Sequence, residues 1–476
     1  MTLFSPIRLG ALELANRIVL PAMVTRLSGE DGLVNAPIRD RYVRFAKGEP
    51  GLVVVEAMAV HEAKSGPLLR ISSDAFVPGL TELRRACADV SPSKVVPQII
   101  HFLKISRSGW RQTVDTLSLA DIAAIVSAYA AAAVRARACG FDGVELHMAH
   151  AYTLSSFLSR VNPRRDAYGG TLENRLRLPS EVLTAVRAAV GEDFPVGVRF
   201  VADEAIKNGY TVVEAALIAE RFARLGAAWI SLSAGGKFED AIKKEGEPLY
   251  PYTGYSGDRC MPGAAYPEGA NVALAAHVRA HLRARGLKAA VCASGKIGSL
   301  ALAESIIADE RADLVAMARA LLADPDLPNK WRAGREDTVV RCLYGNVCKA
   351  LDESFRRVTC TLWPKGALQA PESSDRVPPE WPASGAKLAG SFGGGQIVLT
   401  WMPATDNEAM YGYQLLRATN DGVLLHHSSI RARSTRWEDT TVTAGNRYRY
   451  ALRPYDLAGN RGPASATIEV AVPSVG

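Results

Sequence analysis

No stretch of the 476-residue sequence approaches the roughly eighteen apolar residues that a membrane-spanning helix requires. The first residues, MTLFSPIRLGALELANRIVLPAM, also lack the basic segment, apolar core and cleavage site of a secretion signal. These two absences lead us to expect a cytoplasmic protein with no membrane partner. Hydrophobic residues still make up 48% of the sequence and charged residues 22%, so a sizeable core is expected.

Disulfide-type cysteine spacing and concentrated positive charge are absent as well. The seven cysteines are an odd number without the spacing of a small disulfide-bonded domain, which agrees with a reducing compartment. The net charge of +7 comes mostly from scattered arginines, with no basic tail and no basic patch interleaved with aromatic residues. We therefore expect no nucleic-acid partner, although an anionic substrate is compatible with the mildly basic surface.

Short apolar runs alternate with longer segments of helical periodicity between residue 18 and residue 317. The eight predicted strands are Ile18–Pro21, Leu52–Ala59, Val95–His101, Gly143–Leu146, Val196–Phe200, Trp229–Ser233, Ala289–Ala293 and Leu314–Met317. Helices are predicted over Leu119–Cys139, Leu172–Val190 and Thr211–Leu225. Thr211 and Glu214 have the spacing of a capping box that opens the last of these helices.

This alternation favours one α/β architecture over another. A doubly wound sheet would normally carry a glycine-rich dinucleotide loop after its first strand, and the sequence has none after Ile18–Pro21. Eight strand–helix units in about 300 residues fit a TIM (β/α)8 barrel better. A barrel predicts that the chemistry lies at the C-terminal ends of its strands.

The pattern changes after residue 368. The segment 369–395 is rich in proline, serine and glycine and indicates a linker that leads into a new domain. Alternating apolar and polar residues then predict strands at Gln396–Met402, Gly412–Ala418, Arg447–Pro454 and Ile468–Val472. We expect a barrel domain with a cysteine-containing extension over residues 1–368, a linker over 369–378, and a small all-β sandwich over 379–476.

The predicted sandwich resembles a fibronectin type III domain, which has an immunoglobulin-like fold. The resemblance rests on Trp401, Tyr413, Asp439 and the run around Tyr450. It implies that the tryptophan packs in the core and that a tyrosine near Tyr450 makes the corner contact of such sandwiches. These roles are structural, and we expect the domain to mediate dimerisation, to cover the barrel or to bind a partner. A homo-oligomer is expected.

The most informative stretch is 145–174, ELHMAHAYTLSSFLSRVNPRRDAYGGTLEN. It follows an apolar strand and places His147, His150 and Tyr152 within six residues. Residues with this spacing cannot all face one way in an extended chain, but a strand end that curls into a helix can bring them together. From the pattern alone, two interpretations stay open: a catalytic site, or a pair of buried histidines beside a packing tyrosine.

The longer pattern resembles the active-site signature of the old yellow enzyme superfamily of flavin-dependent oxidoreductases. The pattern is HxxHxYxLxxFLSxxxNxRxDxYGGxxENR. It is matched by His147, His150, Tyr152, Leu154, Phe157, Leu158, Ser159, Asn162, Arg164, Asp166, Tyr168, Gly169, Gly170, Glu173, Asn174 and Arg175. The chain is similar above all to the 2,4-dienoyl-CoA reductase-like branch.

This resemblance implies that FMN lies over the barrel mouth. The residues it assigns to the flavin ring are Pro21, Ala22, Met23, Ala57, Gln98 and Arg199. The small side chain of Ala57 lets the ring approach, the amide of Gln98 bonds the pyrimidine, and the cation of Arg199 stabilises the anionic reduced ring. Gly295, Ala318 and Arg319 are assigned to the phosphate.

The resemblance also implies a reaction. Hydride passes from NAD(P)H to the flavin and then to the β-carbon of an α,β-unsaturated carbonyl compound, an enone or an enoyl thioester. His147 and His150 bond the carbonyl oxygen, and Tyr152 donates the proton to the α-carbon. His101 is expected to be a structural neighbour.

Two departures from the family concern the electron supply. Val24 stands where relatives often carry a threonine or cysteine that contacts the flavin. The segment RCLYGNVCKALDESFRRVTC resembles the iron–sulfur segment of the dienoyl-CoA reductase branch, but it has Cys342, Cys348 and Cys360 with Gly345 in the second position. A four-iron cluster normally takes four thiolates. We therefore favour loss of the cluster over a three-cysteine variant.

Two other functions remain as alternatives. Oxidative demethylation of an amine or betaine, which some relatives perform, would need aromatic residues around a cationic substrate, and Tyr250–Cys260 supplies aromatics. The other alternative is an inert barrel that serves as a binding scaffold, with the sandwich as its active part. The intact set of His147, His150, Tyr152, Gln98 and Arg199 argues against it.

Overall fold

The computed structural model describes residues 2–63, 66–103, 112–235, 259–372, 375 and 377–474. The chain forms two compact units. The first, here the barrel unit, comprises Met1–Ala333 and Tyr344–Thr359, and the second, the sandwich unit, comprises Gly334–Leu343 and Cys360–Gly476. The predicted limits of the linker at 369–378 stay a prediction.

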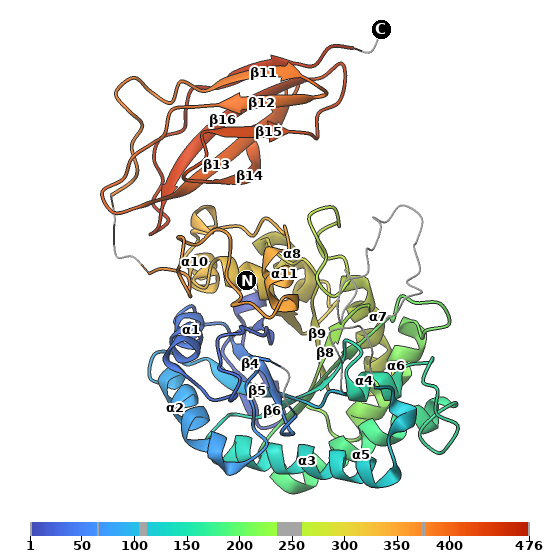
Figure 1. Cartoon of the computed structure of the whole chain (residues 1–476). Coiled ribbons are helices and arrows are strands. Elements are labelled where there is room, and N and C mark those ends of the chain that lie inside the picture. Colours follow the sequence, from blue (N-terminus) through green and yellow to red (C-terminus); the bar gives the residue numbers. More distant parts are fainter. Residues whose placement is uncertain are drawn as a thin grey trace. The chain divides into compact units, whose positions relative to one another are not determined.

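The barrel unit is built on a closed ring of eight parallel strands (Figure 1). In ring order they are β10 (Leu314–Ala316), β3 (Ile18–Leu20), β4 (Leu52–Ala59), β5 (Lys94–Ile100), β6 (Val144–Met148), β7 (Val196–Val201), β8 (Trp229–Ser233) and β9 (Ala290–Ala293). All eight strands predicted from the sequence are present, which confirms the TIM barrel. Because the strands are buried on both faces, they appear in the sequence as nearly continuous apolar runs.

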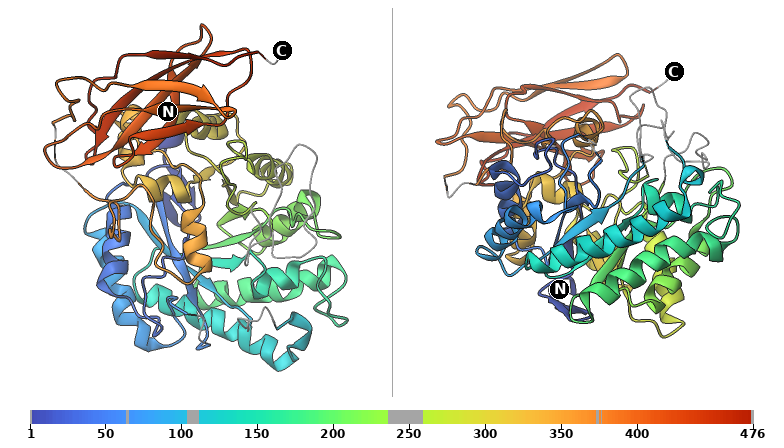
Figure 2. Two further views of the ribbon diagram at one scale, coloured as in Figure 1. Left: turned by 45° about the horizontal axis from the view of Figure 1, so that its top comes forward. Right: turned by 60° about the horizontal axis from the view of Figure 1, so that its bottom comes forward.

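Helices surround the strands in all views (Figures 1 and 2). They are α1 (Ala36–Ala46), α2 (Val77–Ala88), α3 (Leu119–Ala138), α4 (Thr153–Leu158), α5 (Leu172–Val190), α6 (Val212–Arg224), α7 (Val272–Arg283), α8 (Leu300–Ala308), α9 (Ala318–Ala323), α10 (Leu327–Arg332) and α11 (Val347–Glu353), with short 3-10 turns η1 (Thr2–Phe4), η2 (Asp74–Phe76) and η3 (Val114–Thr116).

A small hairpin closes the amino-terminal end of the barrel. Strands β1 (Ile7–Leu9) and β2 (Leu12–Leu14) pair antiparallel and bury Leu9 and Leu14 against the strands. The indole of Trp229 lies over Gly197, where an added Cβ would come within 1.9 Å of it. The hairpin and this indole fill the amino-terminal end, and in such barrels the chemistry lies at the opposite rim, which is formed by the carboxyl ends of the strands.

The predicted capping box at α6 is wrong. Thr211 is the N-cap residue but its side chain makes no cap hydrogen bond, and Glu214 instead pairs with Arg175 at 2.7 Å. A complete capping box lies at α3, where Ser118 and Asp121 bond each other's backbone amides. The buried guanidinium of Arg175 needs a carboxylate, and this long-range pairing takes Glu214 from the local motif.

Contrary to the expectation that no stretch approaches the apolar length of a membrane span, helix α3 is the one described helix that is long and apolar enough, by length and composition, to cross a membrane. Its inner face buries Ile122, Ile125 and Tyr129. The Tyr129 hydroxyl accepts the backbone N–H of His101 at 2.9 Å, just after β5. These contacts tie α3 to the barrel wall, and a helix of this composition is ordinary in that position.

The sandwich unit consists of two antiparallel sheets (Figure 2). One has the order β11 (Ala389–Gly393), β12 (Gln396–Thr400), β15 (Arg436–Asp439) and the other β14 (Leu425–Arg431), β13 (Met410–Thr419), β16 (Arg447–Asp456), β17 (Ile468–Ala471), after the short turn η4 (Glu336–Thr338). The core joins residues of both sheets: Ile397, Leu399, Trp401, Tyr413, Leu415, Ile430, Tyr450 and Leu452. This confirms an all-β sandwich, and three of its strands, β11, β14 and β15, were not predicted.

Two tyrosines of β16 bond back towards earlier residues. The Tyr448 hydroxyl accepts the backbone N–H of Thr443 at 2.8 Å, and the Tyr450 hydroxyl donates to the Asp439 carboxylate at 2.7 Å. The first contact has the form of the expected corner, five residues upstream of its tyrosine. The assignment to the fibronectin type III family stays a prediction.

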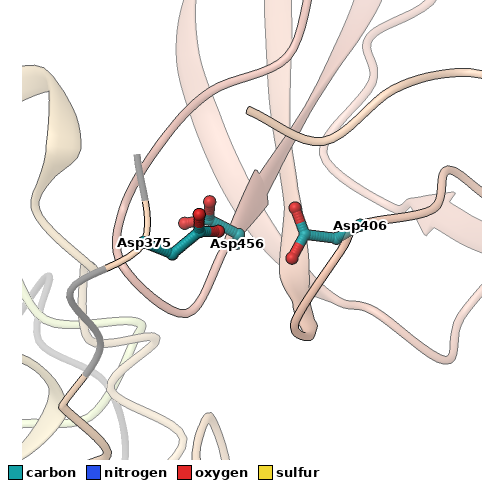
Figure 3. A group of neighbouring side chains, drawn as sticks. All are labelled: Asp375, Asp406 and Asp456. Atoms are coloured by element: carbon teal, nitrogen blue, oxygen red, sulfur yellow. The ribbon is translucent and has the colours of Figure 1, made fainter. Parts of the chain in front are cut away.

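Three carboxylates of the sandwich unit lie close together, with one oxygen each of Asp375, Asp406 and Asp456 within 4.8 Å of the others (Figure 3). Two of them bond groups of their own loops. Asp406 accepts the backbone N–H of Glu408 at 3.0 Å, and Asp456 accepts the backbone and side-chain N–H groups of Asn460, both at 2.8 Å. Burial raises the pKa of Asp456, and the two neighbouring carboxylates raise it further.

Candidate functional site

The residues predicted for the site come from seven segments at one rim of the barrel. Gln98 lies in β5, His147 in β6 and Arg199 in β7, each one or two residues before its strand ends. Because carboxyl ends of parallel strands meet at the same edge, these side chains share one end of the barrel. Ala57 lies in β4, two residues before the strand ends at Ala59.

His147, His150 and Tyr152 do converge. After β6 the backbone adopts left-handed conformations at His150 (φ 57°) and Ala151 (φ 59°), and Tyr152 then occupies the N-cap position of α4. The ring centroid of His147 lies 5.2 Å from that of His150 and 5.1 Å from that of Tyr152. Left-handed backbone at two adjacent non-glycine residues is costly, and here it accompanies the approach of the His150 and Tyr152 rings to the ring of His147.

Both histidines of this cluster are neutral at physiological pH. Burial, together with the positive charge of Arg199, lowers the pKa of His147 to about 3. Burial, then His147 and Arg199, hold the pKa of His150 well below its usual 6.5. The Nδ1 atom of His147 accepts the backbone N–H of Ala149 at 3.1 Å, so its proton is on Nε2. His147 is therefore a neutral N–H donor.

Strand β8 contributes two serines that sequence reasoning missed. The Ser231 hydroxyl accepts Nη1–H of Arg199 at 2.8 Å, and the Ser233 hydroxyl lies 2.7 Å from Nε2 of His150. The sequence of β8, WISLS, did carry a signal. Serine at alternating positions of a fully buried barrel strand points two hydroxyls to the same side of the strand.

A buried carboxylate orients Gln98. The Gln98 Nε2–H donates to Glu145 Oε1 at 2.7 Å, and Glu145 Oε2 accepts the indole N–H of Trp229 at 2.9 Å. All three side chains are buried. Because Glu145 fixes the amide nitrogen of Gln98, the Gln98 carbonyl oxygen is left for another donor. Glu145 opens the motif stretch, but its contact with Gln98 depends on register between β5 and β6 and is not visible in the sequence.

Gly295, Ala318 and Arg319 lie near the ends of β9 and β10. Gly295 has φ 109°, and an added Cβ would lie 2.8 Å from the Asn271 side-chain nitrogen. Ala318 begins α9, whose N-cap residue Met317 gives no side-chain cap, so the first amides of the helix have no side-chain acceptor from that residue. Arg319 is buried and donates from Nη1 to Pro262 O at 2.8 Å and Asn346 Oδ1 at 2.6 Å.

The three extension cysteines are divided between the units. Cys348 lies in α11 of the barrel unit, whereas Cys342 and Cys360 belong to the sandwich unit. Burial raises the pKa of the Cys348 thiol above its usual range. All three thiols are free of disulfides. The aromatic residues between Tyr250 and Asp258, predicted for a cationic substrate, lie outside the described residues.

Comparison with known proteins identifies relatives of the barrel. The model of the NADH:flavin oxidoreductase / NADH oxidase family matches residues 81–244 and 269–338. An NADH oxidase of Thermoanaerobacter brockii is 32% identical over 385 residues, 76% of this chain and 56% of the relative. An NADPH dehydrogenase of a Geobacillus species is 33% identical over 344 residues, 68% of this chain and 92% of the relative.

Other relatives have different names. An N,N-dimethylglycine/sarcosine dehydrogenase of Chromohalobacter salexigens is 29% identical over 381 residues, 73% of this chain and 50% of the relative. A solved 2-naphthoyl-CoA reductase superposes with a TM-score of 0.67 at 22% identity, over 79% of this chain and 60% of the reductase, and supports the fold. The chain thus spans only about half the length of several curated relatives that it matches.

Proposed function

Since the chain belongs to the NADH:flavin oxidoreductase / NADH oxidase family, we propose that it is an FMN-dependent ene-reductase. It would reduce the C=C bond of an enone or enoyl thioester with hydride from NADH or NADPH. The observation that carries this proposal is the ring cluster of His147, His150 and Tyr152, with two neutral imidazoles at the rim.

The rim residues fit FMN. Membership of the family implies flavin and nicotinamide use. Arg199 and Gln98 are both buried. Arg199 bonds Ser231 and Gln98 bonds Glu145, and these contacts leave other N–H groups of Arg199 and the carbonyl oxygen of Gln98 for a ligand. The first amides of α9 and the buried guanidinium of Arg319 suit a phosphate group. In this proposal Pro21, Ala22, Met23 and Ala57 contact the ring, and Gly295 and Ala318 contact the phosphate.

When bound, FMN supplies the hydride that it has received from the nicotinamide. The protein's own part is to polarise the substrate and provide the proton. His147 donates its Nε2–H to the carbonyl oxygen of the substrate, and His150 is the second donor. A neutral imidazole keeps its proton while negative charge develops on that oxygen, so the two rings stabilise the charge by hydrogen bonding. Tyr152 donates its hydroxyl proton to the α-carbon.

The proposal is tested by following the two half-reactions separately. Anaerobic stopped-flow measurements would mix the yellow protein with NADH or NADPH and then mix the reduced protein with enones and enoyl thioesters. We expect reduction by at least one nicotinamide and reoxidation by at least one unsaturated carbonyl compound. A protein that stays colourless after incubation with FMN would refute the proposal and favour the scaffold function.

Oxidative demethylation is the second candidate, because one relative is named an N,N-dimethylglycine/sarcosine dehydrogenase. The same instrument separates the two functions. Anaerobic bleaching of the flavin by sarcosine or dimethylglycine, with no reoxidation by unsaturated carbonyl compounds, would favour the demethylase.

We also propose that the chain holds no four-iron cluster, because Gly345 stands where the related segment has its second cysteine. Iron analysis of anaerobically prepared protein tests this point. Near-stoichiometric iron would contradict it and would add an electron carrier to the proposed scheme.

A further inference from the structure

Strand β4 contains a charged residue that the proposed chemistry does not use. Its sequence is LVVVEAMA, and all eight residues are buried. Glu56 has no exposed surface. A carboxylate in such a place loses several kcal/mol of hydration unless its oxygens receive hydrogen bonds. An apolar residue would fill the same space at lower cost, so the acceptor function of Glu56 needs an explanation.

Glu56 makes one strong contact to another segment. Its Oε2 accepts the backbone N–H of Thr25 at 3.0 Å. The Tyr42 hydroxyl of α1 accepts the Glu56 backbone N–H at 2.7 Å and lies 3.5 Å from Oε2. Glu56 Oε1 is buried and has no hydrogen-bond partner among the described residues. The carboxylate is therefore placed for Thr25.

Thr25 belongs to the loop that follows β3, and this loop is fixed from two sides. Its N–H goes to Glu56, and its carbonyl oxygen accepts the backbone N–H of Val358 at 2.8 Å. Arg41 of α1 donates to the Val358 carbonyl oxygen at 3.1 Å and so helps to hold Val358 in place. The carboxylate provides the inner of the two attachments.

This loop begins with Pro21, Ala22 and Met23, and Glu56 directly precedes Ala57. We propose that Glu56 is a positioning residue for FMN: its carboxylate ties the loop after β3 to β4 and so sets the spacing between the Pro21–Met23 backbone and Ala57. This inference rests on the proposed flavin site. It assigns to Glu56 no contact with the flavin.

The charge state of Glu56 does not alter the tie. Burial raises its pKa to about 7, against the opposing effects of hydrogen bonds from the side chain and the backbone of Thr25 and of the charges of Arg41 and Arg26. Either protonation state retains an oxygen that accepts the Thr25 N–H. The acceptor is therefore the property to test, and a neutral amide should replace it.

The experiment compares Glu56→Gln, which keeps an acceptor, with Glu56→Met, which has similar length and no acceptor of comparable strength. Asp142→Ala is the matched control. Asp142 accepts the backbone N–H of Val95 at 2.8 Å, just before β6, at the opposite end of the barrel. The readouts are the FMN dissociation constant, the midpoint reduction potential of the bound flavin, and Tm.

For Glu56→Met we expect FMN to bind about tenfold more weakly, the factor for one lost hydrogen bond, and the reduction potential to shift. Glu56→Gln should stay within about threefold of the wild type, and Asp142→Ala should lower Tm without changing either flavin property. Unchanged FMN affinity and potential in Glu56→Met, whatever its Tm, would overturn the inference alone. A wild-type protein that binds no FMN would overturn the proposed function as well.

Discussion

At the scale of single residues, four histidines near the barrel rim have their pKa values lowered by burial. The pKa falls to about 4 for His61, to about 3 for His101 and His147, and well below 6.5 for His150. In each case the folded state binds fewer protons than the unfolded state between the two pKa values. The contribution of each histidine to the free energy of unfolding is therefore complete above pH 6.5 and is lost as the pH falls below that value.

The first prediction concerns this window. Between pH 7 and pH 5 the histidine at position 147 becomes protonated in the unfolded chain but stays neutral in the folded protein. This difference lowers the free energy of unfolding by about 2 kcal/mol for His147 alone. His147→Asn should therefore lose less stability than the wild type over the same interval. Urea unfolding of both proteins at pH 7 and pH 5 measures the difference, and equal losses would show that His147 is charged in the folded protein.

Gly295 gives a second prediction at this scale. Its φ of 109° and the nearby Asn271 side chain both oppose a Cβ. Gly295→Ala should destabilise the barrel by about 2 kcal/mol, more than Gly140→Ala, where φ is 78° but nothing lies within 4 Å of an added Cβ. Thermal unfolding of the two variants gives the comparison. Equal shifts in Tm would mean that the contact with Asn271 relaxes without cost.

At the scale of secondary-structure elements, the sequence predicts the strands of the barrel better than the ends of its helices. Buried parallel strands are recognisable because nearly every residue is apolar, as in β4 and β8. The capping box at Thr211 is wrong because Glu214 bonds the buried Arg175, a partner 39 residues away. The local spacing of residues does not reveal that a distant arginine competes for the carboxylate.

The two helix starts provide the third prediction. The Ser118 hydroxyl accepts the Asp121 N–H and the Ser118 N–H donates to the Asp121 carboxylate, whereas Thr211 makes no side-chain cap bond. Ser118→Ala should lower the free energy of unfolding by about 1 kcal/mol, and Thr211→Ala by only about 0.3 kcal/mol. Denaturant unfolding distinguishes them. A cost for Thr211→Ala as large as that for Ser118→Ala would indicate that Thr211 caps α6 in solution.

The candidate site also contains residues that the sequence predicts and residues that it does not. The motif residues His147, His150 and Tyr152 could be predicted because their spacing is recorded in the sequence. The contacts of Ser233 with His150, of Ser231 with Arg199 and of Glu145 with Gln98 could not, because they arise from strands paired side by side around the barrel. In the sandwich unit, β11 was missed because its sequence, AGSFG, has few strand-forming residues.

At the scale of the whole molecule, every residue assigned to the flavin belongs to the barrel unit. The fourth prediction is that a chain of residues 1–368 retains FMN with an affinity within about threefold of the full chain. Titration of both apoproteins with FMN, monitored by flavin fluorescence, measures this. Loss of FMN from the shorter chain would show that the flavin site depends on the remainder of the sandwich unit.

The most direct test of the ene-reductase proposal is the kinetic effect of Tyr152→Phe on the two half-reactions. The substitution removes the proposed proton donor and leaves the ring that packs 5.1 Å from His147. We predict that reoxidation by an unsaturated carbonyl compound slows by about 100-fold or more, while reduction by the nicotinamide changes by less than about threefold. Equal slowing of both half-reactions would contradict the role of Tyr152 as the proton donor.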